Sequence, residues 1–386
     1  MAMRYVLILA LLTVLAGCAL DDAAPVHSVY RSPDARPTLA SIVYVTDRAA
    51  DAAAPGGFGT RWAATASCGQ VDVTIPAAPL PGQDIPWGYI TANHPTACTT
   101  TAQSSALAGA LAPLVAAAAA RNCHQVLVFV HGFHTGFDGA VLRAGQIGAD
   151  TAYPCPVAAF SWTSEVDLNR YEVDLERSSY AQPLFAEFLR ELNEAGLGVN
   201  IIGHSMGARL ALATLAGFAD SRTEAAKPGA KPVGELILSG ADIGAEPGQN
   251  DFLRLAARAA PFVGRITLYA SHADSMLALS ARNHGGVARL GATLDPPAPD
   301  AVATSIDLID AGHVPADTVG HSYYAMSYEV LADMARVLKG ETLASRMSAH
   351  TTDSLPPASL TGGPPPRPRS DRSPRLISHV LADLIP

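Results

Sequence analysis

The sequence predicts an α/β fold, with a mostly parallel central sheet of about eight strands flanked by helices. Short apolar runs alternate with longer helical stretches along most of the 386 residues, a pattern typical of a parallel sheet covered on both faces. Hydrophobic residues make up 49% of the chain and charged residues 16%, so the composition is that of a globular protein with a large core. The net charge of -9 argues against a nucleic-acid partner.

The expected elements follow one another in a regular order. Two strands come first, at 41–46 and 71–75, and the proline-containing stretch 76–101 is expected to be a loop. A helix over 105–121 precedes the buried strand 125–130. Further strands are expected at 157–160, 199–202, 235–239, 265–270 and 305–309, and further helices at 138–152, 171–195 with a break at Pro183, 206–219, 250–260, 275–282 and up to Leu338.

The first residues have the features of a secretion signal. Arg4 supplies a positive charge and residues 6–15 form an apolar run that is too short to span a membrane. The Leu-Ala-Gly that precedes Cys18 resembles a bacterial lipobox. That resemblance implies cleavage after residue 17, acylation of Cys18 and a lipid anchor in the membrane of the cell envelope, and Ala19 favours the outer membrane. The alternative is an ordinary signal peptide with an incidental cysteine.

Composition divides the rest of the chain into three parts. Residues 18–38 lack periodicity and are expected to tether the domain to the lipid. Residues 39–340 contain all the expected strands and helices. Residues 341–386 become rich in Pro, Ser, Gly and Arg, which predicts a disordered tail.

Four cysteines beyond Cys18 can form disulfides in an oxidising compartment. Four cysteines allow three pairings, and nearness in sequence favours Cys68 with Cys98 and Cys123 with Cys155. Four buried free thiols are the alternative. Metal binding is less favoured because the chain has no C-x-x-C pair.

The most informative stretch is Gly-His-Ser-Met-Gly at residues 203–207. It follows the apolar run 199–202 and precedes 208–213, which is rich in helix formers. A strand that leads through G-x-S-x-G into a helix is the nucleophile elbow of alpha/beta-hydrolases. The two glycines suit a turn too sharp for side chains, and the turn presents the Ser205 hydroxyl as a nucleophile. The sequence therefore predicts the alpha/beta-hydrolase fold.

A serine nucleophile needs a histidine base and a carboxylate that orients it. In this fold the order along the chain is Ser, Asp, His, and Asp274 and His321 follow the second and third strands after the Ser205 strand. Asp242, at the end of the next strand, competes for the role of acid. His313, in the same loop region as His321, competes for the role of base.

Two backbone amides are expected to bind the oxyanion. One belongs to Met206, directly after the serine, and the other to Phe133, after the strand that ends at His131. His131 and His134 could instead be proposed as metal ligands, but no third ligand has a convincing spacing. Neither a metal nor another cofactor is therefore expected.

Several of these motifs together resemble a bacterial alpha/beta-hydrolase family known as domain of unknown function 900, whose members are often labelled esterase- or lipase-like lipoproteins. The resemblance covers about residues 40–340 and implies the roles of Ser205, Asp274 and His321. Two positions depart from the family pattern, His134, where asparagine is usual, and 273–276, where Asn-Asp-Arg-Ala is usual. The matching residues are YVTDR at 44–48, VLVFVHGFHTGFDG at 126–139, Phe-Ser-Trp at 160–162, Tyr171 with Asp174, HSMGAR at 204–209 and residues 266–291.

These observations predict a serine hydrolase of the cell envelope that cleaves small carboxylic esters through an acyl-enzyme. The alternative is a non-catalytic binding or scaffolding protein of the envelope built on the same fold.

Overall fold

The computed structural model describes residues 38–75, 90–98, 104–220, 232–245, 251–293, 306–314, 316–346 and 375–376. The expected signal peptide, Cys18 and nearly all of the tether lie outside the described residues. No helix within the described ranges has both the length and the apolar character needed to cross a membrane.

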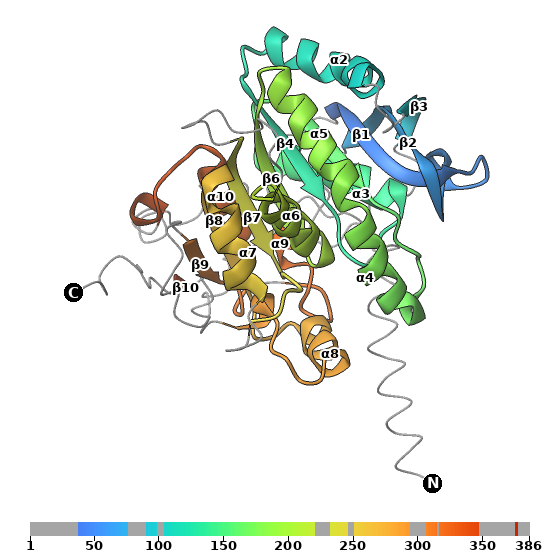
Figure 1. Cartoon of the computed structure of the whole chain (residues 1–386). Helices are drawn as coiled ribbons and strands as arrows, with labels where there is room; N and C mark the ends of the chain where they lie inside the picture. Colours follow the sequence, from blue (N-terminus) through green and yellow to red (C-terminus); the bar gives the residue numbers. More distant parts are fainter. Residues whose placement is uncertain are drawn as a thin grey trace, which may run out of the picture.

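A ten-stranded sheet forms the centre of the molecule (Figure 1), in the order β10-β9-β8-β7-β6-β4-β5-β1-β2-β3. The strands from β9 through β1 in this order pair in parallel, and β10, β2 and β3 add antiparallel pairs at the edges. The mostly parallel sheet is thus confirmed, with ten strands among the described residues where about eight were expected. The strands are β1 (Thr38–Ala50), β2 (Phe58–Ile75), β3 (Ile90–Cys98), β4 (Gln125–Val130), β5 (Val157–Ser161), β6 (Gly198–His204), β7 (Val233–Ser239), β8 (Val263–Ala270), β9 (Ile306–Asp310) and β10 (Arg375–Leu376).

Helices cover both faces of this sheet (Figure 1). One buried apolar cluster contains residues of α2, α5, α6 and α7, and the other contains residues of α3, α9 and α10. The helices are α2 (Ser104–Ala120), α3 (Phe137–Asp150), α4 (Tyr171–Tyr180), α5 (Gln182–Glu194), α6 (Met206–Gly217), α7 (Asp251–Ala259), α8 (Ser275–Asn283), α9 (Tyr323–Met326) and α10 (Tyr328–Leu338).

Strand β4 shows why these runs fold as buried strands. Val126, Val128 and Val130 enter the first cluster, and Leu127 and Phe129 enter the second. Successive side chains of a strand point to opposite faces, so an unbroken apolar run suits a strand buried on both sides. Burial of each such side chain contributes about 1.5–3 kcal/mol.

The stretch expected to be a loop, 76–101, contains a strand. Within it, β3 pairs antiparallel with β2 and places Pro95 opposite Gly69. Proline cannot donate a backbone hydrogen bond, and it is tolerated here because β3 is the last strand at its edge of the sheet. The other expected break is confirmed, since α4 ends at Tyr180 and Pro183 lies in the first turn of α5.

Two disulfides join neighbouring strands. Cys68 bonds to Cys98 between β2 and β3, with a Cα–Cα distance of 5.7 Å. Cys123 bonds to Cys155 just before β4 and β5, with a Cα–Cα distance of 5.6 Å. These are the pairs that nearness in sequence favoured.

The folded domain extends further along the chain than the expected boundary at residue 340. Arg346 is fully buried, and its guanidinium donates to Asp333 Oδ2 at 2.6 Å and to the carboxylate of Asp307. Tyr269 also donates to Asp333 Oδ2, at 2.7 Å. Breaking a buried ion pair of this kind costs about 3–5 kcal/mol, so the segment up to Arg346 belongs to the folded unit. From the expected tail, β10 also pairs with β9.

Candidate active site

Ser205 lies at the sharp turn between β6 and α6. Its backbone has φ 53° and ψ -119°, a conformation that costs a residue with a side chain about 1–3 kcal/mol. The serine is also buried, with 5% of its surface exposed. Strain of this kind is what the nucleophile elbow requires.

The two glycines of the elbow are enforced by close backbone contacts. A Cβ on Gly203 would lie 2.7 Å from the Ala208 Cα, and one on Gly207 would lie 2.2 Å from the His131 carbonyl oxygen. Both distances are far inside van der Waals contact. Glycine therefore lets α6 begin directly against the ends of β4 and β6, as the sequence pattern predicts.

Asp274 and His321 form a close pair. Asp274 Oδ2 lies 2.7 Å from His321 Nδ1, and both residues are buried. Burial raises the pKa of the Asp274 carboxyl, and His321 together with the Leu277 amide lowers it in part. Because a carboxylate can only accept, the Nδ1 of His321 donates and its Nε2 carries the lone pair.

The loop that carries His321 is fixed by neighbouring side chains. The His321 amide donates to Asp317 Oδ1 at 2.7 Å, and His204 Nε2 donates to the His321 carbonyl at 3.3 Å. The His204 ring stacks on Tyr324 with 4.2 Å between ring centroids. Burial, followed by the charges of His321 and Arg143, lowers the pKa of His204 well below its ordinary value, so this ring is neutral.

Gly240 leaves room for the His321 ring. It has φ 53°, and a Cβ there would lie 3.2 Å from His321 Cε1. The Gly240 amide donates to the Tyr323 hydroxyl at 2.8 Å, and this hydroxyl donates to the Tyr269 carbonyl at 2.9 Å. The two tyrosines after His321 thus stabilise its surroundings, Tyr324 through His204 and Tyr323 through Gly240.

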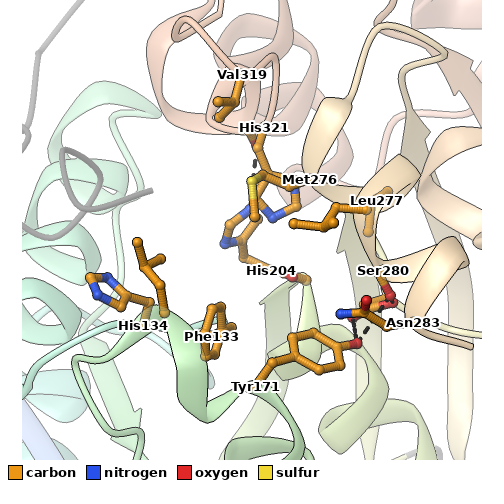
Figure 2. Close-up of a pocket in the computed structure, with 14 residues that line it drawn as sticks. Phe133, His134, Tyr171, His204, Met276, Leu277, Ser280, Asn283, Val319 and His321 are labelled. Carbon is orange, nitrogen blue, oxygen red and sulfur yellow. Dashed lines mark hydrogen bonds between the residues drawn. The ribbon is translucent and has the colours of Figure 1, made fainter. Parts of the chain in front are cut away.

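A small cavity of about 70 Å³ is lined by both Ser205 and His321. Figure 2 shows His321 among the residues around it. Typical ligand pockets measure roughly 300–1,000 Å³, so the space next to the serine suits a small group. The other lining residues are Phe133, His134, Leu168, Tyr171, His204, Asp242, Met276, Leu277, Leu279, Ser280, Asn283 and Val319.

The competing acid and base have other partners. Asp242 accepts hydrogen bonds from Arg289 Nε at 2.6 Å, Tyr171 at 2.5 Å and Ser280 at 2.6 Å. His313 is 40% exposed, and its Nε2 lies 3.9 Å from Asp310 Oδ2. The structure therefore pairs Asp274 with His321, and His321 lines the same cavity as Ser205.

The expected oxyanion donors lie next to the serine. A Cβ on Gly132 would lie 2.9 Å from the Ser205 Cβ, so the chain after β4 passes directly beside Ser205. Phe133 follows Gly132 and lines the cavity, and Met206 begins α6. Both amides therefore belong to residues next to Ser205 or next to a residue that contacts it.

Arg48 anchors the loop of residues 131–135. It is fully buried. Its guanidinium donates to the Thr135 carbonyl at 2.6 Å, the Ser164 carbonyl at 3.0 Å and Ser161 Oγ at 3.1 Å. A planar donor with several N–H groups can bind these acceptors at the same time. The sequence offered no signal for this role beyond the place of Arg48 in the YVTDR motif.

Asp174 holds the same loop from α4. Its carboxylate accepts from Ser164 Oγ at 2.5 Å, from the Glu165 amide at 2.8 Å and from the His134 backbone amide. Burial raises its pKa to about 6, although these hydrogen bonds and Arg48 lower it.

His131, one of the two histidines considered as metal ligands, has a packing role. Its ring stacks on Trp162 at 5.0 Å, and its Nδ1 and Nε2 face the Gly132 and Trp162 carbonyls at 2.8 and 3.1 Å. Burial, and then the charge of Arg48, lowers its pKa to about 3, so the ring is neutral. In the described parts of the chain, no group of three or more His, Cys, Asp or Glu residues could hold a metal ion.

Residues 112–339 match the sequence model of a protein family that is described as "Alpha/beta hydrolase of unknown function (DUF900)". Among curated proteins no sequence matches significantly. Two structures of an esterase from the archaeon Pyrobaculum calidifontis are 13% and 14% identical, with TM-scores of 0.33 and 0.34, and each match covers 56% of this chain and 76% of that one. A structure from work on two fungal esterases from Rhizomucor miehei is 8% identical, with a TM-score of 0.37, covering 79% of this chain and 85% of that one. These values are too low to support a conclusion about function.

Proposed function

Since the chain belongs to the alpha/beta-hydrolase family of unknown function DUF900, we propose that it is a serine esterase that cleaves small carboxylic esters through an acyl-enzyme. One observation carries the proposal. The strained Ser205 shares a cavity with His321, whose Nδ1 lies 2.7 Å from the Asp274 carboxylate. A nucleophile, a base and an orienting acid thereby come from three separate loops at one edge of the sheet.

In this mechanism Ser205 Oγ attacks the ester carbonyl carbon while His321 Nε2 accepts its proton. The Phe133 and Met206 amides donate to the oxyanion of the tetrahedral intermediate. His321 then gives the proton to the leaving alcohol as the C–O bond breaks, which leaves the acyl group on Ser205. Water attacks the acyl carbon with His321 again as the base. As the bond between the acyl carbon and Ser205 Oγ breaks, His321 returns the proton to Oγ and the acid is released. Asp274 holds the tautomer of His321 and stabilises the imidazolium.

The size of the cavity supports small substrates. A space of about 70 Å³ beside Ser205 accommodates a short acyl group more readily than a long chain. Its walls are largely apolar, with Phe133, Met276, Leu277 and Val319 among them.

Hydrolysis of p-nitrophenyl esters with acyl chains of increasing length tests this function. We expect turnover of the short members, and a loss of at least about a thousandfold in kcat for Ser205→Ala, because the nucleophile is the group most needed for the acyl-enzyme. Ser179→Ala, at an exposed serine of α4, is the matched control. Equal activity of Ser205→Ala and wild type would refute the proposal.

We also propose that Cys18 anchors the protein in the cell envelope, with an outer-membrane address. The support is the lipobox-like sequence that ends at this cysteine. Metabolic labelling with a palmitate analogue should mark the wild type and not Cys18→Ala. Equal labelling of the two would exclude this anchor.

A further inference from the structure

One corner of the cavity is polar. Tyr171 at the start of α4, Asp242 after β7 and Ser280 in α8 meet there, and we call these three residues the hydroxyl corner. The oxygen–oxygen distances are 2.5 Å for Tyr171–Asp242, 2.6 Å for Ser280–Asp242 and 3.0 Å for Tyr171–Ser280. Figure 2 shows the Tyr171 hydroxyl pointing towards Ser280, with His204 and His321 elsewhere around the cavity.

Asp242 enters this corner as a charged acceptor. Burial alone would raise its pKa, but Arg289 and the two hydroxyl groups hold the pKa below its ordinary value. Arg289 Nε lies 2.6 Å from Asp242 Oδ1, and its Nη2 donates to the Asp242 carbonyl at 2.9 Å. Burial also raises the pKa of Tyr171, so the tyrosine keeps its proton.

The corner therefore has three oxygen–oxygen contacts but only two hydroxyl protons, one on Tyr171 and one on Ser280, that can form hydrogen bonds in them. A hydrogen bond to an ionised acceptor is roughly twice as strong as one between neutral groups. Both hydroxyl protons consequently go to the Asp242 carboxylate. No proton then lies between the Tyr171 and Ser280 hydroxyl oxygens, which are 3.0 Å apart. Their lone pairs face each other and can both accept a hydrogen bond.

The adjacent histidine does not supply the missing donor. His284 Nδ1 lies 2.9 Å from the Ser280 carbonyl oxygen and 3.5 Å from Ser280 Oγ. The N–H of His284 therefore donates to the Ser280 carbonyl oxygen, because 3.5 Å exceeds the usual length of a hydrogen bond. Tyr171 and Ser280 both line the cavity, so a donor that enters from this side can bind both oxygens.

We propose that the hydroxyl corner is a subsite for a hydroxyl group of the ester substrate, which places the substrate class among hydroxylated esters. This inference rests on the proposed esterase function. The substrate hydroxyl donates to Tyr171 and Ser280. Asn283 lines the cavity beside them (Figure 2), and its amide can donate to the oxygen of the same hydroxyl. A cation is disfavoured because Arg289 already neutralises Asp242.

Matched pairs of esters that differ by a hydroxyl test this subsite, one pair for each side of the ester bond. The acyl pair is p-nitrophenyl 3-hydroxybutyrate and p-nitrophenyl butyrate. The alcohol pair is 3-hydroxypropyl butyrate and propyl butyrate. In one of the pairs we expect the wild type to favour the hydroxylated ester in kcat/KM by about tenfold, the factor expected of roughly one neutral hydrogen bond.

The decisive quantity is how this preference changes on mutation. Tyr171→Phe and Ser280→Ala should each bring the preference towards unity, because each removes one acceptor. Tyr180→Phe, at an exposed tyrosine of the same helix, should retain it. Intrinsic reactivity of the esters and any general loss of folded enzyme cancel in this ratio of ratios.

The outcomes separate the subsite from the esterase function. A preference lost in the acyl pair assigns the hydroxyl to the acid part of the substrate, and one lost in the alcohol pair assigns it to the alcohol part. Hydrolysis with the same ratio in wild type and both variants, for both pairs, would overturn the subsite and leave the esterase standing. If the wild type cleaves no ester, the esterase proposal fails and the subsite fails with it.

Discussion

The two carboxylate oxygens of Asp274 have separate partners, and one of these is His321. Oδ2 lies 2.7 Å from His321 Nδ1, and Oδ1 accepts from the Leu277 amide at 3.0 Å as the N-cap of α8. The hydrogen bond from the Leu277 amide fixes the orientation of the carboxylate, so that its other oxygen faces His321. In the proposed mechanism, helix capping and orientation of the base are therefore two tasks of one side chain.

Asp274→Asn separates these two tasks. Asparagine is as good an N-cap as aspartate, so the fold should be retained. Its amide would donate to His321 Nδ1 and favour the tautomer that cannot accept the serine proton, so we expect kcat to fall by about 10³- to 10⁴-fold. Ester kinetics and thermal unfolding measure the two effects. Asp251→Asn, at a partly exposed residue of α7, is the control. Retention of more than a tenth of the wild-type kcat by Asp274→Asn would contradict the assignment.

Asp174 predicts a pH dependence of stability. Its pKa rises from 3.8 to about 6 in the folded protein, so the folded state holds the proton more tightly than the unfolded chain. As pH rises from about 4 to about 6 the unfolded chain releases the proton first, and this group lowers the free energy of unfolding by up to about 3 kcal/mol. Asp174→Asn does not titrate. Urea unfolding should therefore show the wild type losing stability relative to this variant across that window, and a difference that is constant with pH would contradict the shift.

The Cys123–Cys155 disulfide should contribute measurably to stability. It closes a segment with a sequence separation of 32, for which the loss of chain entropy in the unfolded state corresponds to about 3–4 kcal/mol. We expect the double variant Cys123→Ser/Cys155→Ser to lose about this much free energy of unfolding. A peptide map without reduction should recover the linked pair from the wild type. Alkylation of both cysteines in unfolded, unreduced protein would show that the bond is absent.

Local pattern was sufficient to predict most of the fold. Buried parallel strands such as β4 are unbroken apolar runs, and the elbow at Ser205 has a sequence pattern imposed by sterics at Gly203 and Gly207. Strand β3 was missed because an edge strand accepts Pro95, which counts against a strand in any local reading. Arg346 was placed in the tail because its carboxylate partners, Asp307 and Asp333, lie 39 and 13 residues away.

For the acid and the base of the candidate site, the sequence left two candidates each. The order of Ser205, Asp274 and His321 along the chain agrees with the fold, but strand count alone left Asp242 open as the acid. What distinguishes Asp242 is Arg289, 47 residues away. In the hydroxyl corner, Asp242 likewise contacts Tyr171 and Ser280, which lie 71 and 38 positions away along the chain. A local sequence pattern cannot predict contacts between residues so far apart.

Covalent labelling with a fluorophosphonate tests the activated serine most directly, because only a serine with a functioning base reacts readily with it. Mass spectrometry of the wild type should find one adduct, on the peptide that contains Ser205, and none in Ser205→Ala. His321→Ala should strongly slow the labelling. A folded wild-type protein that remains unlabelled, or an adduct that persists in Ser205→Ala, would contradict the account.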